Sequence, residues 1–437
     1  MPKGVEHRTY QETLDFLFHL EVSKGIDLKL ERVRLALAAL GSPERAFVSL
    51  HVAGTNGKGS TAAMLHAILS AAGCRVGLYT SPHLVDFCER IRIGERGIAP
   101  EEVVALVAEL CRCFTNRGLE LTYFEFVTVL AFYYFALSRV EVAAVEVGLG
   151  GRFDATNVIA SGVALITSIG LDHEEYLGHD LLGIAREKGG IIKAGMPTVV
   201  GKVGEEVGVT LREIAAERRS PIYFFGTDFD VKLWEDGAFD YHGLRWRAER
   251  LPLSLRGAYQ RRNAAVALAA LEHIQSRFPV CEKHIREGLA AVRWPGRLEV
   301  VQEKPLVVLD GAHNPQGVET LVEELPALLG GRRAKLLFGV MRDKRWAEMV
   351  PQLARVASEV VVTLVARPRG EDPHALAQVF APFLPTRVVE DAQEACRQLI
   401  QEAHPQEAVL VCGSLFLIGA VYPLFCRTQD VFSSARV

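Results

Sequence analysis

The residues best suited to chemistry in this sequence form one glycine-rich run, Gly54-Thr55-Asn56-Gly57-Lys58-Gly59-Ser60-Thr61. An apolar, β-forming segment precedes it, and apolar residues recur at helical spacing after it. In a loop between a strand and a helix, glycines let the backbone approach an oxyanion. The helix N-terminus adds partial positive charge, and Lys58 supplies a mobile ammonium. The run therefore predicts a phosphate-binding loop for a nucleoside triphosphate.

This loop is shorter than the ordinary Walker pattern, which has four residues before its Gly-Lys pair and a hydroxyl residue directly after the lysine. Here only Thr55 and Asn56 precede Gly57-Lys58, and Gly59 separates the lysine from Ser60. A glycine-rich turn that binds nothing is the alternative. The lysine, the hydroxyl residues and the flanking elements together favour phosphate binding.

Two polar residues end apolar runs farther along the chain. Glu146 closes the run that begins at residue 142, where a carboxylate is costly unless it has a partner. His173 follows the run 163–169, and ligands gather at strand ends in doubly wound sheets. A metal ion would satisfy Glu146, but so would an arginine, and a loop histidine is often structural. The residues alone leave both possibilities open.

The last third of the chain carries a second set of polar residues. Asp310 ends the apolar run 306–309 and opens Gly311-Ala312-His313-Asn314-Pro315, again a strand-to-turn position. Arg297 follows the pair Pro295-Gly296, which is a plausible hinge. An arginine near phosphates neutralises charge that develops during transfer. The alternative is that Asp310 caps a turn and Arg297 pairs with Glu299.

The order of elements predicts an α/β protein with two domains. Short β-rich runs alternate with helical stretches, as in parallel βα units. We expect a P-loop doubly wound parallel sheet domain over 1–295 and a second, smaller Rossmann-like α/β domain over 296–437. Within the first, the segment 221–255 alternates around two turn signals and predicts a small antiparallel insertion.

Composition excludes several classes of function. The formal net charge of −4 leaves no global basic field that would recruit nucleic acid or an anionic membrane. No charge-free apolar run reaches membrane-spanning length, and the N-terminus lacks a signal-peptide core. The eight cysteines have no paired metal spacing, which indicates reduced thiols. We expect a soluble, cytoplasmic monomer.

The shortened loop, extended back to His51, resembles the folylpolyglutamate synthase and dihydrofolate synthase branch of the Mur ligase superfamily. Further segments are similar to this family and follow in one order along nearly the whole chain. These are residues 80–84, 121–125, 146–152, 154–157, 168–173, 186–188, 260 with 263, 295–297, 310–315 and 413–415.

The resemblance implies a metal site and a modified lysine. The residues that match the family's magnesium ligands are Ser81, Glu146 and His173. Lys188 matches a lysine that reacts with carbon dioxide to give a carbamate, an anion that supports a second magnesium ion. That reaction needs a neutral amine, and burial or nearby cations lower a lysine pKa toward that state. The composition around Lys188 alone indicates an ordinary surface lysine near a helix end.

The resemblance also implies how the substrates bind. Asn263, Arg297 and Asp310 would join the glycine loop at ATP, with His313 close by. Catalytic roles would fall to Lys58, Lys188, His173, Arg297 and His313. The pterin would contact three matched segments: Asp27-Leu28-Lys29-Leu30, Thr122-Tyr123-Phe124 and Phe153-Asp154-Ala155. The family usually has glycine where Lys29 stands and often leucine where Phe153 stands.

The implied activity is ATP-dependent addition of L-glutamate to dihydropteroate and to reduced folates through an acyl phosphate. A Mur-type ligase for cell-wall precursors is one alternative, but it should lack the resemblance at 27–30 and 122–125. A P-loop kinase or NTPase is another, and it would need only the first domain. A non-catalytic nucleotide-binding protein would be expected to have lost Lys58, Glu146 or His173, and all three are present.

Overall fold

The computed structural model describes residues 8–24, 29–366 and 368–426. The chain divides into two compact units. The first comprises Met1–Ile169, His179–Pro252 and Arg261–Val292, and the second comprises Gly170–Gly178, Leu253–Gln260 and Arg293–Val437. The expected α/β class is confirmed in both units, which are described separately below.

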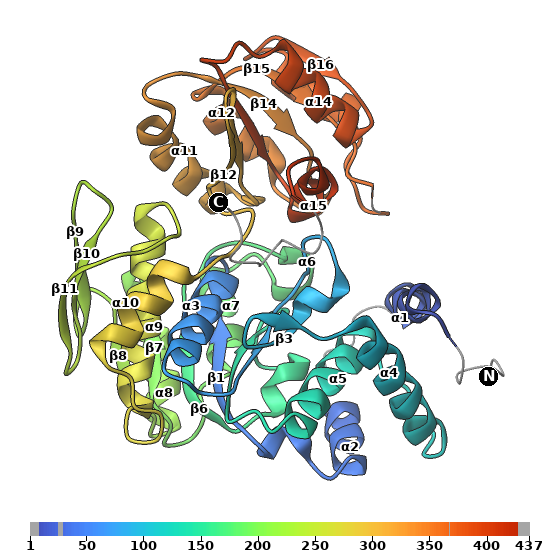
Figure 1. Ribbon diagram of the computed structural model, residues 1–437, viewed down its shortest axis with the longest axis vertical. Helices are drawn as coiled ribbons and strands as arrows, with labels where there is room; N and C mark the ends of the chain where they lie inside the picture. Colours follow the sequence, from blue (N-terminus) through green and yellow to red (C-terminus); the bar gives the residue numbers. More distant parts are fainter. Residues whose placement is uncertain (1–7, 25–28, 367, 427–437) are drawn as a thin grey trace. The chain divides into compact units, whose positions relative to one another are not determined.

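The first unit is built on an eight-stranded sheet in the order β4-β3-β2-β5-β1-β6-β7-β8. Its central strands pair in parallel, while β3 is antiparallel to both β2 and β4. The central strands are apolar and buried because helices cover the sheet on both faces (Figure 1). The strands are β1 (Val48–Ala53), β2 (Val76–Tyr79), β3 (Ile91–Ile93), β4 (Arg96–Gly97), β5 (Val142–Glu146), β6 (Ser161–Ile166), β7 (Thr198–Val200) and β8 (Ile222–Phe224).

Helices α3 and α10 pack together, and aromatic rings hold α5 to its surroundings. Phe47, for example, meets the rings of Phe132 and Phe135 edge-on. The helices and 3-10 turns of this unit are α1 (Tyr10–Lys24), α2 (Glu31–Ala39), η1 (Pro43–Arg45), α3 (Lys58–Ala71), η2 (Phe87–Arg90), α4 (Pro100–Thr115), α5 (Tyr123–Leu137), η3 (Ala155–Val158), α7 (Leu181–Gly189), α8 (Glu205–Glu217), most of α9 (Ala258–Ile274) and α10 (Glu282–Ala291).

The expected antiparallel insertion exists as a three-stranded sheet of β9 (Asp230–Leu233), β10 (Phe239–His242) and β11 (Arg247–Leu251). It lies beside α9 and α10 (Figure 1). The expectation, which began the insertion at residue 221, was wrong for residues 222–224. These residues form β8, which pairs in parallel with β7. Helix α8 supplies the crossover that a parallel neighbour requires.

The second unit contains a six-stranded sheet in the order β12-β13-β17-β14-β15-β16, parallel except for β12. Its strands are β12 (Glu299–Glu303), β13 (Leu306–Leu309), β14 (Ala334–Phe338), β15 (Ala357–Val362), β16 (Thr386–Val388) and β17 (Ala408–Cys412). Its helices and 3-10 turn are α6 (Glu174–Leu177), α11 (Pro315–Leu329), α12 (Trp346–Ala354), α13 (Pro373–Phe380), α14 (Ala392–Glu402), α15 (Leu415–Val421) and η4 (Tyr422–Leu424).

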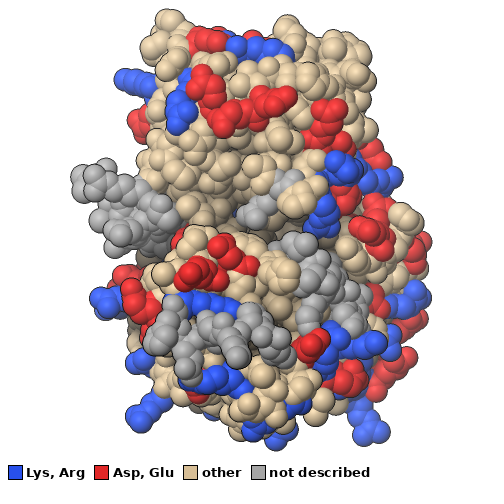
Figure 2. Space-filling view, turned by 90° about the vertical axis from the view of Figure 1, so that its right-hand side faces the viewer, with Lys and Arg blue, Asp and Glu red and all other residues tan. Residues whose placement is uncertain are grey.

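The surface and the cysteines agree with the composition. Acidic and basic side chains are intermixed over the face that Figure 2 displays. All eight cysteines are free thiols, and Cys396 and Cys412 are buried. Among the described residues, no helix is both long enough and apolar enough to cross a bilayer.

Candidate active site

The phosphate loop joins β1 to α3 and has the backbone conformation that its glycines predict. Gly54 has φ +148°, and Gly57, with φ +86°, is the residue before the helix. An ideal Cβ on Gly57 would lie 2.6 Å from Oδ1 of Asn263, so this side chain, expected at ATP, lies against the loop. Lys58 is the first residue of α3, and its Nζ donates to the Thr55 carbonyl at 3.2 Å.

The loop is held in place by the residues that follow β6. The Thr167 hydroxyl donates to the Asn56 carbonyl at 2.6 Å, and Ser168 Oγ accepts from the Asn56 N–H at 3.0 Å. The Thr55 N–H donates to the Ser168 carbonyl at 2.8 Å. These bonds fix the backbone before any ligand arrives, so less ordering is needed when phosphate binds.

Two of the expected metal ligands lie together. Glu146 is the last residue of β5 and is only 5 % exposed, as a carboxylate with a specific partner should be. Its Oε2 accepts the Ser81 N–H at 3.1 Å. Oxygen donors of this kind suit a hard cation such as Mg²⁺. Within the described part of the chain, no three His, Cys, Asp or Glu side chains group as metal ligands; the expected set has only one carboxylate and one imidazole, Glu146 and His173.

Lys188 lies in the last turn of α7, as expected, but it is not a surface lysine. It is only 6 % exposed. Its Nζ donates to the Gly54 carbonyl at 3.1 Å, which brings it to the first glycine of the phosphate loop. Burial of a lysine favours its neutral form, the form that reacts with carbon dioxide. Carbamylation of Lys188 itself stays a prediction.

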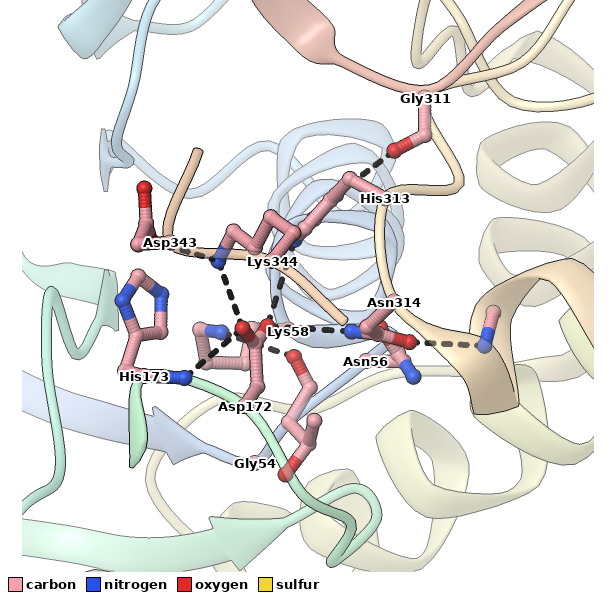
Figure 3. Close-up of polar contacts among 12 residues, drawn as sticks. Gly54, Asn56, Lys58, Asp172, His173, Gly311, His313, Asn314, Asp343 and Lys344 are labelled. Atoms are coloured by element: carbon pink, nitrogen blue, oxygen red, sulfur yellow. Dashed lines mark hydrogen bonds and ion pairs between the residues drawn. The ribbon is translucent and has the colours of Figure 1, made fainter. Parts of the chain in front are cut away.

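In the second unit, five residues form what we call the Asp172 cluster (Figure 3): Asp172, His173, His313, Asn314 and Lys344. Oδ1 of Asp172 accepts from Lys344 Nζ at 2.6 Å and from the His173 N–H at 2.8 Å. Its Oδ2 accepts from Asn314 Nδ2 at 3.0 Å and lies 3.3 Å from His313 Nε2. One carboxylate thus contacts the ring of His313 and the backbone of His173.

The neighbours of Asp172 favour its ionised form. Burial by itself raises the pKa of Asp172, but the hydrogen bond and electrostatic interaction with His313, together with the Lys344 ammonium, hold this pKa well below its usual value. His313 Nδ1 lies 2.8 Å from the Gly311 carbonyl, which can only accept, so Nδ1 carries a proton and Nε2 faces the carboxylate. His173 has φ +52°, a left-handed conformation uncommon for a residue with a side chain.

Asp310 and Arg297 also come together in the second unit. Asp310 follows β13, is 5 % exposed, and accepts N–H bonds from Leu298 at 2.7 Å and Ala312 at 2.8 Å. Burial raises the pKa of Asp310, and the nearby Arg297 partly offsets this. The Arg297 Nη1 donates to the Gly296 carbonyl at 2.9 Å and would lie 2.3 Å from a Cβ on Gly311. Arg297 therefore lies over the turn that Asp310 opens.

The expected pterin residues divide into three groups. Asp27 and Leu28 lie outside the described residues, whereas Lys29 is exposed and Leu30 is buried at the start of α2. Thr122 caps α5 by accepting the Glu125 N–H. Tyr123 is buried and stacks on Phe18, with ring centroids 6.0 Å apart.

Phe124 lies against the loop after β5. An ideal Cβ on Gly148 would be 2.3 Å from the Phe124 ring, so only glycine fits there. Farther along this loop Phe153 is 41 % exposed, with the Arg152 guanidinium 5.2 Å from its ring centroid. Asp154 is buried and accepts the Leu149 N–H at 2.8 Å, so its carboxylate shapes the loop. Ala155 is buried as well.

Sequence reasoning had not assigned a role to Thr167, Ser168, Asp172, Asn314 or Lys344. All five follow strand ends: Thr167, Ser168 and Asp172 come after β6, Asn314 after β13, and Lys344 after β14. Applying the strand-end rule to every strand would have found Lys344. Its pairing with a residue 172 positions away could not be read from the sequence.

A shortened phosphate loop on a parallel sheet, followed by a second α/β unit with its own polar cluster, defines a Mur-type ligase. Two family models agree with this class: the Mur ligase middle domain matches residues 52–271, and the Mur ligase glutamate ligase domain matches residues 296–415.

Known proteins are similar over almost the full length. A folylpolyglutamate synthase of Lacticaseibacillus casei is 37% identical over 407 residues, covering 89% of this chain and 92% of that protein. A dihydrofolate synthase/folylpolyglutamate synthase of Escherichia coli is 38% identical over 411 residues, 93% of each chain. The chain belongs to the folylpolyglutamate synthase and dihydrofolate synthase family of Mur ligases, and it is an ATP-dependent carbon–nitrogen ligase.

Solved structures of this family are similar to the fold of this chain. E. coli FolC in complex with DHPP and ADP has a TM-score of 0.89 and 34% identity, covering 97% of this chain and 99% of that one. A bifunctional enzyme of Yersinia pestis complexed with AMPPNP and a Mn ion has a TM-score of 0.86 and 35% identity, covering 97% and 99%.

Proposed function

We propose that this chain is bifunctional: it adds L-glutamate to dihydropteroate and also to tetrahydrofolate or folylpolyglutamates. The observation that carries the proposal is the preformed phosphate loop with Lys188 bonded to its first glycine. Relatives of both names support it, and so do solved neighbours that hold ADP, AMPPNP, a Mn ion or DHPP. The ranges matched by the two Mur ligase models support a domain division into 1–295 and 296–437.

In this reaction the acceptor's carboxylate attacks the terminal phosphorus of ATP, and ADP leaves. The resulting acyl phosphate has a good leaving group, so the amine of glutamate displaces phosphate, loses a proton and forms the amide. The loop N–H groups and Lys58 would stabilise the charge on the transferring phosphoryl group. Arg297 would neutralise phosphate charge in the same way. Asp172 and the Gly311 carbonyl would orient the His313 ring for polar contact with the reactants.

The metal assignment is part of the proposal. Ser81, Glu146 and His173 would hold one magnesium ion, and a carbamate on Lys188 would help to hold a second. Bound magnesium supplies Lewis-acid neutralisation of phosphate oxygens. Exposed Phe153, together with Thr122, Tyr123 and Phe124, would contact the pterin, as would the matched segments 27–30 and 154–155.

The test is glutamate-dependent ADP release by purified protein with Mg²⁺, using dihydropteroate, tetrahydrofolate or no acceptor. We expect stimulation by both acceptors and none with a Lys58→Ala variant. Stimulation by one acceptor alone would reduce the function to a single activity. No stimulation by either would overturn the folate assignment.

A further inference from the structure

The loop after β5 and the end of α7 touch at their backbones. An ideal Cβ on Gly151 would lie 2.8 Å from the Glu187 carbonyl oxygen, and one on Gly190 would lie 2.4 Å from the Arg152 Cα. The Arg152 N–H donates to the Glu187 carbonyl at 2.8 Å. This contact joins the loop that carries Phe153 to the helix turn that carries Lys188. A displacement of either segment therefore moves the other.

A buried asparagine bridges these two segments. Asn157, in η3, is 8 % exposed. Its Nδ2 donates to the Arg152 carbonyl at 2.9 Å and to the Gly190 carbonyl at 3.1 Å. One amide group thus bonds the loop and the end of α7 at the same time.

Lys193 fixes the direction in which this amide points. Its Nζ donates to Asn157 Oδ1 at 2.6 Å and to the Asn157 carbonyl at 2.9 Å. An ammonium can only donate, so Oδ1 must face Lys193 and Nδ2 must face the two carbonyls. With Lys193 removed, Oδ1 loses its donor, and only the two carbonyls hold the amide in place.

The charge of Lys193 has no acidic partner among the described side chains. Its charged neighbours are Arg218 and Arg34, and Arg218 Nη1 donates to the Ile192 carbonyl at 2.8 Å. Burial and these two cations lower the pKa of Lys193 to about 8. Burying the Lys193 ammonium near two other cations costs free energy. Its two hydrogen bonds to Asn157 offset part of that cost.

We propose that Asn157 and Lys193 are positioning residues that clamp the 148–154 loop to the end of α7. They thereby set the placement of the pterin-facing Phe153 and of Lys188 together. The effect of this clamp on the pterin rests on the proposed function. The clamp itself consists only of contacts within the fold. Neither Asn157 nor Lys193 contacts the phosphate loop in the described contacts. The clamp therefore acts directly on the acceptor-side loop and on the helix turn of Lys188, and it reaches the phosphate loop only through the bond from Lys188 to the Gly54 carbonyl.

The test compares Lys193→Met, which keeps the length but removes the donors, with Lys193→Arg, which keeps the charge and donors. Lys283→Met, at a 76% exposed side chain on α10, is the matched control. Loss of a charge-assisted hydrogen bond predicts a ten- to hundredfold loss of kcat/KM for the acceptor, roughly. We expect the KM for ATP to stay within about twofold, Lys193→Arg to recover part of the loss, and the control to match wild type.

Hydrogen–deuterium exchange by mass spectrometry gives a second readout. In Lys193→Met we expect faster exchange in peptides covering 148–157 and 186–193, with the phosphate-loop peptides unchanged. A folded variant with wild-type acceptor kinetics overturns the proposal, as does an equal rise in both KM values or a lower melting temperature as the sole effect. If Lys193→Met does not fold, Asn157→Asp, which keeps an oxygen toward Lys193 but loses Nδ2, carries the same test.

If the wild-type protein shows no acceptor-dependent turnover, the proposed function fails, and the exchange measurement alone then decides the clamp. Unchanged exchange in both peptides would overturn it, and selective loss of protection there would support it.

Discussion

Replacing Asp172 by asparagine is the sharpest perturbation of the second unit. The change keeps size and shape but removes the negative charge from the Asp172 cluster. Lys344, whose side chain is 8% exposed, would then lose a carboxylate at 2.6 Å. Breaking a buried ion pair from one side costs about 3–5 kcal/mol, because the remaining charge stays buried without compensation. We expect a loss of that order in the stability of the second unit.

Asp343 offers a control on the same ammonium. It lies 3.7 Å from Lys344 Nζ and its side chain is 20% exposed. A longer and more solvent-exposed ion pair contributes less to stability, so Asp343→Asn should lower the free energy of unfolding by less than about 1 kcal/mol. Pairing Asp172→Asn with Lys344→Met in a double-mutant cycle isolates the coupling, since both single changes act on one contact.

The assay is urea-dependent hydrogen exchange of amides in β14 and β17, which reports opening of the second unit rather than of the whole chain. The pKa of Asp172 is lowered on folding, so its contribution is complete above the unfolded pKa near ~3.9 and is lost as pH falls below it. The difference between wild type and Asp172→Asn should therefore stay constant from about pH 5 to 8 and shrink only below about 4. Equal effects of Asp172→Asn and Asp343→Asn would refute this reasoning.

Three further predictions concern the first unit. Gly57→Ala should raise the KM for ATP at least tenfold, roughly, because its Cβ would meet Asn263 at 2.6 Å; Gly73→Ala, with a similar φ of +82° but nothing within 4 Å, should leave that KM unchanged in the same assay. Lys188→Met should lower kcat about a hundredfold or more while the melting temperature, followed by circular dichroism, falls little; an unchanged kcat would contradict its assignment. The pKa of Lys193 is lowered from 10.5 to about 8, so the folded state binds fewer protons and urea-measured stability should rise between pH 8 and 10.5. The Lys193→Met variant should lack that rise in stability. A pH profile of the variant that runs parallel to that of the wild type would contradict the assignment of the rise to Lys193.

The site was predictable from sequence where its chemistry is local. The phosphate loop was found because glycines at 54 and 57, a lysine and two flanking periodic segments all lie within one short stretch. The position of Glu146 at a strand end followed from an apolar run that a carboxylate interrupts. The structure confirms both placements, with Gly57 in a left-handed conformation and Glu146 ending β5.

Errors and omissions arose where a residue's surroundings come from distant parts of the chain. Lys188 has an ordinary composition around it, yet it is buried against the Gly54 carbonyl, 134 residues away. Tyr223 and Phe224 have the alternating texture of a hairpin, but the crossover through α8 places them on the edge of the parallel sheet. The local sequence pattern does not show which distant segments pack against a residue. It therefore could not show that Lys188 is buried or that Tyr223 and Phe224 pair with β7.

The sequence by itself determined the class of both units and the phosphate loop, since these depend on periodicity and on short runs of residue types, while the expected chemistry came from the resemblance to a known family. The tertiary structure alone decided that Thr167 and Ser168 hold the loop and that Asp172 pairs with Lys344. It also decided that Asn157 and Lys193 join the β5 loop to α7. Each of these is a contact between side chains brought together by strand order, and burial gives such contacts an energy that no local pattern carries.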